Sequence, residues 1–327
     1  MPTNQFDQAV ELQLDLFRAT TEIDSNVLGL LLALQKDLIS QVANANYTQW
    51  GQRRIQQQLS EVDALIKQRY AEVSTAAQGS TSAIAQVSAL ATARSLSVSS
   101  QAALPSQAML EAIASKSVVQ GATQGAWWSR QSADTSFRFS QAVRQGLVAG
   151  ETNQKIIQRV RSFMDTSKAN ASALVQTSVA TVANDGRSAV FSSNQDIIKR
   201  LRAVATLDTN TCTTCAPLDG LEWTKARNPI GHKFDFPNYP KHFNCRCLLI
   251  PVVLDGPQGG TRASDAGQVD ASLTFRGWLK RQPVDKQDEI LGRGRAKLYR
   301  DGKITLADLT RGNGAPLTID ELKRKYA

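Results

Sequence analysis

Every cysteine of this chain lies in one short stretch, and this clustering constrains the fold more than any other feature of the sequence. Cys212 and Cys215 occur in TCTTCAPLDG, and KHFNCRCLL supplies His242, Cys245 and Cys247. Two cysteines separated by two residues can turn both sulfur atoms toward one point, and thiolates and imidazole are the ligands that tetrahedral zinc prefers. The spacing therefore predicts a Zn²⁺ site, or at least paired thiols, in the second half of the chain.

The cluster offers five ligands for four positions, so the sequence leaves the fourth ligand open. His242 and Cys245 have the spacing of a zinc knuckle, whereas Cys245 and Cys247 share one face if that segment is a strand. Reduced cysteines or two disulfides are the alternative, and a cytoplasmic origin disfavours the disulfides. Cysteine and histidine ligands would fill the coordination shell, which predicts a structural rather than a catalytic site. We expect His232 at the surface or beside the ligands.

The chain is long enough, at 327 residues, to fold without covalent cross-links. Aromatic residues make up only 6% of it, and Ala, Ser and Gln crowd the first two hundred positions, which favours helices. The opening MPTNQFDQAVELQ is polar and does not resemble a secretory signal. The most apolar stretch, Val27 to Leu34, is far shorter than the ~20 residues of a membrane helix. We therefore expect synthesis in a cytoplasm and no membrane partner.

Helical spacing of apolar residues dominates the first half of the chain. Phe6 to Asn46 predicts two helices broken near Asp24 and Ser25, and a long helix follows from Thr48. Its stripe of Leu59, Val62, Ile66, Tyr70 and Val73 indicates core packing in a bundle, with a partner-binding coiled coil as the alternative. Residues 74–104 form a Ser/Ala-rich tract that is either a weak helix or a mobile connector.

Helices are also expected after Pro105, one of which carries the Trp127 and Trp128 pair and stops at Gly150. Two more helices follow, Gln154 to Met164 and Ser167 to Val190. One tryptophan of the pair should lie in the core, and the other should cover that core or face a partner.

The pattern changes near residue 197, where short strands are expected at 202–207, 221–224 and 248–253. The fold class is therefore mainly α, with an extended helical N-terminal region and a small α+β, zinc-stabilised module in the second half. In the tail, Thr305 with Asp308 and Thr318 with Glu321 predict capping boxes. The predicted segments are a helical arm with its connector, a helical domain, the Cys/His module, a linker and a basic helical tail, at 1–104, 105–196, 197–256, 257–268 and 269–327.

The block DTNTCTTCAPLDG, followed by HFNCRC and an apolar strand, resembles the signature of the Mu F-like phage head morphogenesis proteins. The resemblance extends roughly from Phe137 to Leu322 and includes the tail FRGWLKRQPVDKQDEILGRGRAKLYRDGKITLADL. The chain departs from the family pattern at residues 176–178, where relatives often carry Arg-Thr-Glu, and at Phe243, where proline is usual. The family's paired cysteines, Asp-Gly and His-x-x-Cys-Arg-Cys map onto Cys212, Cys215, Asp219, Gly220, His242, Cys245, Arg246 and Cys247.

The resemblance implies a minor capsid protein of a tailed phage, made in the host cytoplasm and located in the virion at the portal vertex and head interior. Its implied partners are the portal protein, the major capsid protein or both, and an oligomer around the portal is consistent with this. Its implied role is head assembly, DNA packaging or DNA ejection, without enzymatic activity. The alternative is a metal-dependent nuclease or a transferase-type phage enzyme, for which His232, Asp235 and Asp219 are the nearby candidate bases.

Two smaller expectations concern charge. The formal net charge of +9 favours an anionic partner, and packaged double-stranded DNA is the candidate, although a solvated helix face explains the same residues. Asp219 and Gly220 form a good turn pair, and Arg246 is expected to pair with an acidic residue or a thiolate. The candidate DNA contacts are Lys280, Arg281, Arg293, Arg295, Lys297 and Arg300.

Overall fold

The computed structural model describes residues 5–96, 102–253 and 259–326, which belong to two compact units. The bundle unit joins residues 16–84 to residues 111–182, and the mixed unit joins residues 1–15, 85–110 and 183–327. Each unit joins segments that are distant in sequence, whereas the segments expected from the sequence are consecutive.

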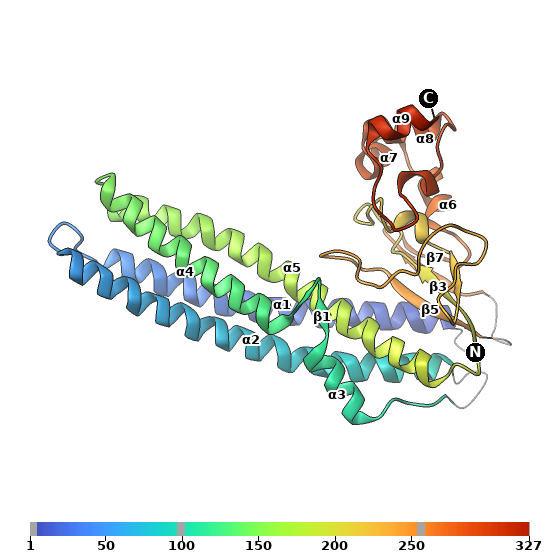
Figure 1. Cartoon of the computed structure of the whole chain (residues 1–327), viewed down its shortest axis with the longest axis horizontal. Coiled ribbons are helices and arrows are strands. Elements are labelled where there is room, and N and C mark those ends of the chain that lie inside the picture. The colour runs from blue at the N-terminus through green and yellow to red at the C-terminus, as the bar shows by residue number, and fades with distance from the viewer. Residues whose placement is uncertain (1–4, 97–101, 254–258, 327) are drawn as a thin grey trace. The chain divides into compact units, whose positions relative to one another are not determined.

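Parts of four long helices form the bundle unit (Figure 1). In it, the Lys168 ammonium donates a hydrogen bond to the Gln35 side chain at 3.1 Å, and the buried hydroxyls of Tyr70 and Thr135 lie 2.9 Å apart. The helices are α1 (Gln5–Ala43), α2 (Gln52–Leu96), α4 (Gln124–Val148) and α5 (Asn153–Ser193). The Lys168 contact therefore joins α1 to α5, and the Tyr70 contact joins α2 to α4.

The apolar stripe expected on the second helix lies in the core of this bundle, since Leu59, Val62, Ile66, Tyr70 and Val73 are all buried. Steps of three and four residues keep these side chains on one face of α2. Core packing is therefore the correct interpretation of this stripe.

Two expected helix breaks are absent. Helix α1 continues through Asp24 and Ser25, because Ile23 and Val27 on either side of them are buried on one face and hold the segment helical. Helix α5 likewise unites the segments expected at 154–164 and 167–190. The Ser167 hydroxyl donates to the Phe163 carbonyl at 3.1 Å within the helix, so it does not cap a new one.

The pattern expected as helix after Pro105 is interrupted by a small hairpin. Helix α3 (Gln107–Lys116) precedes strands β1 (Val118–Val119) and β2 (Ala122–Thr123), and Gln120 and Gly121 between them both have positive φ, as a two-residue hairpin turn requires. Trp128 is buried in the core, whereas the half-buried Trp127 donates its indole N–H to the Val119 carbonyl at 2.6 Å. Trp128 is thus the core residue of the pair, and Trp127 covers that core.

The Ser/Ala-rich tract is helical as far as Leu96, where α2 ends, while residues 97–101 lie outside the described residues. Its composition has a packing reason in the mixed unit. A Cβ atom added at Gly186 of α5 would lie 2.7 Å from the Ala85 carbonyl oxygen of α2. The two helices approach so closely there that only small side chains fit between them.

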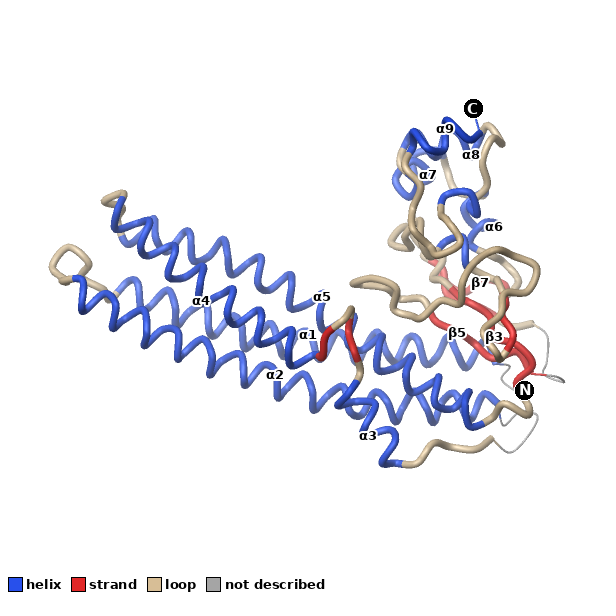
Figure 2. The backbone as a smooth tube through the Cα atoms, in the orientation of Figure 1, coloured by secondary structure: helices blue, strands red, loops and turns tan. Residues whose placement is uncertain are grey.

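A three-stranded antiparallel sheet supports the Cys/His module of the mixed unit; its strands are among those drawn in red in Figure 2. The order is β4 (Glu222–Thr224), β3 (Ile198–Val204), β5 (Leu248–Val253), close to the three expected strands, with β3 beginning four residues earlier. Val204 at the end of β3 pairs with Leu248 at the start of β5. The chain leaving β3 and the chain entering β5 therefore meet at one edge of the sheet.

The segment expected to be a linker contains structure. Strands β6 (Thr261–Ser264) and β7 (Gly267–Asp270) form a hairpin there, while residues 254–258 lie outside the described residues. Strand formation overrides the Gly- and Ser-rich composition because Arg262 of β6 is buried in an ion pair, described below.

The basic tail packs on the Cys/His module. Phe275, Trp278 and Leu322 of the tail share one hydrophobic core with Leu207 and with Ala216. Both expected capping boxes are present, at Thr305 and at Thr318. None of the helices that the structure describes has an apolar stretch long enough to cross a bilayer. The tail contains α6 (Phe275–Lys280), α7 (Val284–Leu291), α8 (Arg293–Arg300), the 3-10 helix η2 (Leu306–Leu309) and α9 (Ile319–Tyr326), and Ala216 begins the 3-10 helix η1 (Ala216–Leu218).

Candidate metal centre

Two turns bring the predicted ligands together where β3 and β5 meet. In the first, the backbone N–H groups of Cys215 and Ala216 both donate to the Cys212 carbonyl, at 3.1 and 2.9 Å. In the second, the Cys245 N–H donates to the His242 carbonyl at 3.2 Å. Asn244 has a positive φ of 61° in this turn, a conformation that asparagine tolerates better than most residues. Each turn therefore aims two ligands at one point.

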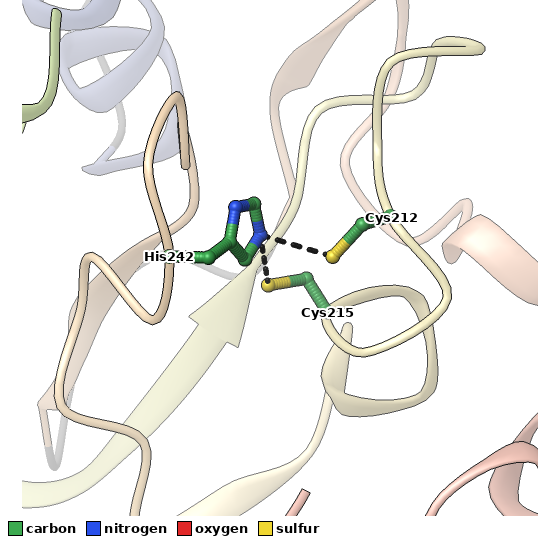
Figure 3. Close-up of side chains that lie close together, drawn as sticks. All are labelled: Cys212, Cys215 and His242. Atoms are coloured by element: carbon green, nitrogen blue, oxygen red, sulfur yellow. Dashed lines mark hydrogen bonds between the residues drawn. The ribbon is translucent and has the colours of Figure 1, made fainter. Parts of the chain in front are cut away.

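The ligand atoms lie close together, and most of their distances are those of a tetrahedral zinc site (Figure 3). The Cys212 sulfur lies 3.0 Å and the Cys215 sulfur 3.7 Å from Nε2 of His242. The sulfur atoms of Cys215 and Cys245 are 3.8 Å apart. With Zn–S bonds of ~2.3 Å and Zn–N bonds of ~2.0 Å, tetrahedral ligands lie roughly 3.5–3.8 Å from one another. Two of the three distances match this range, and the third is shorter.

The imidazole of His242 is oriented as a metal ligand would be. Its Nδ1 lies 2.7 Å from the Phe243 carbonyl oxygen, which can only accept a hydrogen bond, so Nδ1 carries the proton. A neutral imidazole then presents the lone pair of Nε2 to the two cysteines. A backbone carbonyl that holds the outer ring nitrogen is the usual partner of a metal-binding histidine.

Cys247 lies at the margin of the cluster. Potential ligand atoms fall into two triads with all members within 4.8 Å: Cys212, Cys215 and His242, and Cys215, Cys245 and Cys247. The 3.8 Å contact of Cys215 with Cys245 links the triads, and both of these residues are buried. Cys212, Cys215, His242 and Cys245 are therefore joined in a chain by contacts of 3.0–3.8 Å, and Cys247 lies within 4.8 Å of Cys215 and Cys245.

The cysteines and His242 of the cluster shift one another's pKa. Hydrogen bonds with Cys215 and His242 lower the pKa of Cys212 to about 4, against the opposing effect of burial. Hydrogen bonds with Cys212 and Cys245 raise the pKa of His242 to about 11. Thiolate and imidazolium are thus the favoured forms when no metal is bound. A divalent cation can replace the imidazolium proton and neutralise further thiolates, so metal binding here would release protons.

An ion pair joins the two ligand turns. The Arg246 guanidinium donates from both terminal nitrogens to the carboxylate of Asp208, at 2.6 and 2.7 Å. Asp208 also accepts the backbone N–H of Asn210 at 3.0 Å. This two-pronged contact fixes the approach to Cys212 against the segment between Cys245 and Cys247. Of the two partners expected for Arg246, the acidic one is present.

Asp219 is more than a turn residue. Gly220 does take the positive φ of a turn, but the Asp219 carboxylate is buried and pairs with Arg262 of β6 through both oxygens, at 2.7 and 3.0 Å. The same carboxylate accepts the backbone N–H groups of Ala205 and Phe275, at 2.8 and 2.6 Å. It therefore ties the end of β3 to β6 and α6. No local pattern in the sequence points to Arg262, which lies 43 positions away.

Two of the three candidate bases of a nuclease, His232 and Asp219, make other contacts. Nε2 of His232 lies 2.9 Å from the Glu222 carbonyl, and its Nδ1 accepts the Phe234 N–H at 3.2 Å, so both ring nitrogens have backbone partners. The His232 ring also packs edge-on against the buried Trp223. Asp219 is held in its ion pair, and Asp235 is exposed. His232 accordingly supports the fold of this loop, and it belongs to neither ligand triad.

Half of the candidate DNA contacts are used within the protein. Arg295 donates to the Leu317 carbonyl at 3.0 Å, and Lys297 and Arg300 pair with carboxylates at 2.9 and 2.8 Å. Lys280, Arg281 and Arg293 are exposed and have no such partner in the described part of the chain. Of the six candidates, these three side chains are therefore the ones available to an anion.

A comparison with protein families bears on the same region. The model of the family described as Phage Mu protein F like protein matches residues 138–250, which include both ligand turns, Asp208 and Asp219. No curated protein and no solved structure matches the chain. The resemblance carried by the cysteine and histidine motifs is thus confirmed, since residues 138–250, about a third of the chain, are similar to the Phage Mu F-like proteins.

Proposed function

We propose that this chain is a head morphogenesis protein of a tailed phage, and that its Cys/His centre binds one structural zinc ion. The observation that carries the first part is the family match over residues 138–250, which supports a head morphogenesis protein in general. The second part rests on the ligand spacing and on the orientation of His242. The two parts are connected, because the matched segment contains every ligand.

The proposed zinc ligands are Cys212, Cys215, His242 and Cys245. When bound, the metal would supply a cross-link between the two ligand turns, and three thiolates and an imidazole leave it no position for a reacting water. Binding free energy at such a site contributes directly to folding. The centre therefore serves as a rigid base for the sheet and the tail packed on it, and we assign it no catalytic role.

Within the head, we place the protein at the portal vertex and head interior, in contact with the portal protein, the major capsid protein or both. Exposed apolar side chains in the bundle unit support a docking role, since Phe137 is 66% and Val148 92% exposed. Exposed lysine and arginine side chains of the tail support contact with packaged DNA, which would act in packaging or ejection.

The test uses the phage in which the gene occurs. Mass spectrometry of purified virions should detect the protein, and immunoprecipitation from infected cells should recover portal or major capsid protein with it. Virions made with a Cys212→Ser/His242→Ala variant should contain less of it, with empty heads accumulating. Absence of the protein from mature virions, together with binding to neither partner, would contradict the proposal.

A metal-dependent nuclease is the other candidate raised by the sequence, and the contacts of His232 and Asp219 give it no support. The discriminating assay is cleavage of plasmid DNA by purified protein with added Mg²⁺, Mn²⁺ or Zn²⁺. We expect no cleavage above that of a His232→Ala variant. Metal-stimulated cleavage that this variant loses would favour the enzyme.

A further inference from the structure

A cleft of about 250 Å³ opens in the mixed unit, between the last turns of α5 and the loop that follows β4. It is distinct from the metal centre, since none of the proposed zinc ligands lines it. Its base consists of buried side chains, mainly apolar, from three elements and the loop. These are Phe191, Ile198, Leu201, Tyr239 and Leu249.

The rim of the cleft is polar and carries positive charge. Lys225 and Arg227 are exposed there, against one lining carboxylate, that of Asp185. The Lys225 ammonium donates one hydrogen bond to the Gln195 carbonyl at 3.1 Å, and an ammonium has two further donors. The Arg227 guanidinium carbon lies 5.0 Å from the centroid of the Phe236 ring. This contact uses the face of the guanidinium group, so its N–H groups, which point outward in the guanidinium plane, can still bind an anion.

Arg227 has an unfavourable backbone conformation that neighbouring hydrogen bonds hold in place. Its φ is 67°, in the left-handed region that residues other than glycine seldom adopt. The Arg227 N–H donates to the Thr224 carbonyl at 2.8 Å, and the next N–H, of Asn228, donates to the Thr224 hydroxyl at 3.0 Å. Strained conformations of this kind persist where neighbouring contacts impose them, and they concentrate at binding sites. Here the conformation keeps a cation over an aromatic ring at the rim.

The size of the cleft decides what it can hold. Sites for small molecules usually enclose about 300–1,000 Å³, so a cleft of about 250 Å³ is small for a nucleotide but large enough for one big side chain. A phosphate backbone would use the two cations and leave the apolar base unfilled. An apolar side chain flanked by carboxylates would use both the base and the rim.

We propose that this cleft binds an acidic peptide segment of a partner protein. An aromatic or large aliphatic side chain of that segment would fill the base, and carboxylates beside it would pair with Lys225 and Arg227. This inference goes beyond head morphogenesis, because it assigns a docking site and the chemistry of its occupant. It can be tested on purified full-length protein without the phage.

The probe is a fluorescent peptide of sequence Gly-Asp-Glu-Phe-Asp-Glu-Gly, with its binding followed by anisotropy. The same peptide with alanine in place of phenylalanine should bind at least ten-fold more weakly. A Lys225→Glu/Arg227→Glu variant should also lose at least ten-fold in affinity, and so should Ser188→Trp, which places a large ring at the rim of the cleft. Lys199→Glu reverses one positive charge at an exposed site on β3 outside the lining, half the charge change of the double variant, and it should bind within two-fold of the parent protein.

Circular dichroism and zinc content must match the parent protein for all variants, so that misfolding cannot produce the result. Three outcomes overturn the proposal: no binding of the phenylalanine peptide, equal binding of the alanine peptide, or equally effective displacement by inorganic phosphate or a short DNA duplex. The last of these would identify an anion site. Incorporation into virions is a separate readout, so failure here leaves the proposed function standing.

Discussion

Cys215 is the residue on which the two halves of the candidate metal centre meet. It belongs to both ligand triads, and it lies 3.7 Å from His242 and 3.8 Å from Cys245. Hydrogen bonds with the other cysteines raise the pKa of its thiol, because neighbouring thiolates compete for the remaining proton. A metal ion relieves this competition, since one cation can serve all the thiolates.

The position of Cys247 leads to a prediction about zinc content. Cys245→Ser should remove the metal, whereas Cys247→Ser should retain about one zinc per chain, because the Cys245 sulfur lies 3.8 Å from that of Cys215, as tetrahedral ligands do. Elemental analysis of the two purified variants measures this directly, and they form a matched pair with the same substitution two positions apart. Loss of zinc from Cys247→Ser alone would make Cys247 the fourth ligand.

The buried ion pair leads to a second prediction. Asp219→Asn leaves the guanidinium of Arg262, only 4% exposed, without a counter-charge, and breaking such a pair costs about 3–5 kcal/mol. The midpoint of urea unfolding, followed by tryptophan fluorescence, should fall accordingly. Asp301→Asn, which breaks the exposed pair with Lys297, is the control and should leave the midpoint in place. Equal midpoints for the two variants would show that the buried pair does not hold the module together.

The sequence indicated which residues are candidate metal ligands better than it indicated which residues hold those ligands in place. Four cysteines and a histidine in one window indicated a metal site because few other roles need that combination. The contacts that fix those ligands were not visible. Arg262 lies in a Gly- and Ser-rich stretch, and His232 lies close to the ligands in sequence although its nitrogens bond to backbone. Pairing across such separations depends on the fold of the sheet.

The close approach of α2 and α5 in the mixed unit can be tested with a single substitution. Gly186→Ala would place a methyl group 2.7 Å from the Ala85 carbonyl oxygen, and relief of such overpacking typically costs about 1–3 kcal/mol. We expect a lower melting temperature by circular dichroism. Gly29→Ala is the matched control, since nothing lies within 4 Å of its added methyl group and alanine favours a helix by about 0.8–1.0 kcal/mol over glycine. If both variants melt at the parent temperature or above it, the helices are not in close contact at Gly186.

The spacing of apolar residues predicted where helices and strands occur, but it did not predict well where they begin and end. The stripe of α2 and the apolar run of β5 were recognisable because each repeats the spacing of one structure. The breaks expected at Ser25 and near Ser167 were wrong, because polar residues there occur on a helix whose buried face continues past them. For the same reason the sequence did not reveal that α1 and α5, with 39 and 41 residues, are more than three times as long as a typical helix of about 11–12 residues.

For the whole molecule, the sequence indicated a helical half and a Cys/His half but not which segments pack together. Residues 16–84 and 111–182 form one unit, and the tail shares its core with Ala216 beside the first ligand turn. Such contacts arise between segments far apart in the chain. They depend on how the elements pack and not on any local pattern in the sequence.

The two units should therefore respond differently to metal removal. Treatment with a chelator should raise amide hydrogen exchange in residues 205–250, because the ligand turns would lose their cross-link, and this exposure should spread to the tail that packs on Ala216. The core helices at 16–84 and 111–182 have their own buried apolar stripes and should keep their protection. Added zinc should restore the original exchange pattern. Unchanged exchange at 205–250 after complete loss of zinc would show that the metal is not structural, and a simultaneous loss of protection in both units would show that the chain unfolds as one cooperative body.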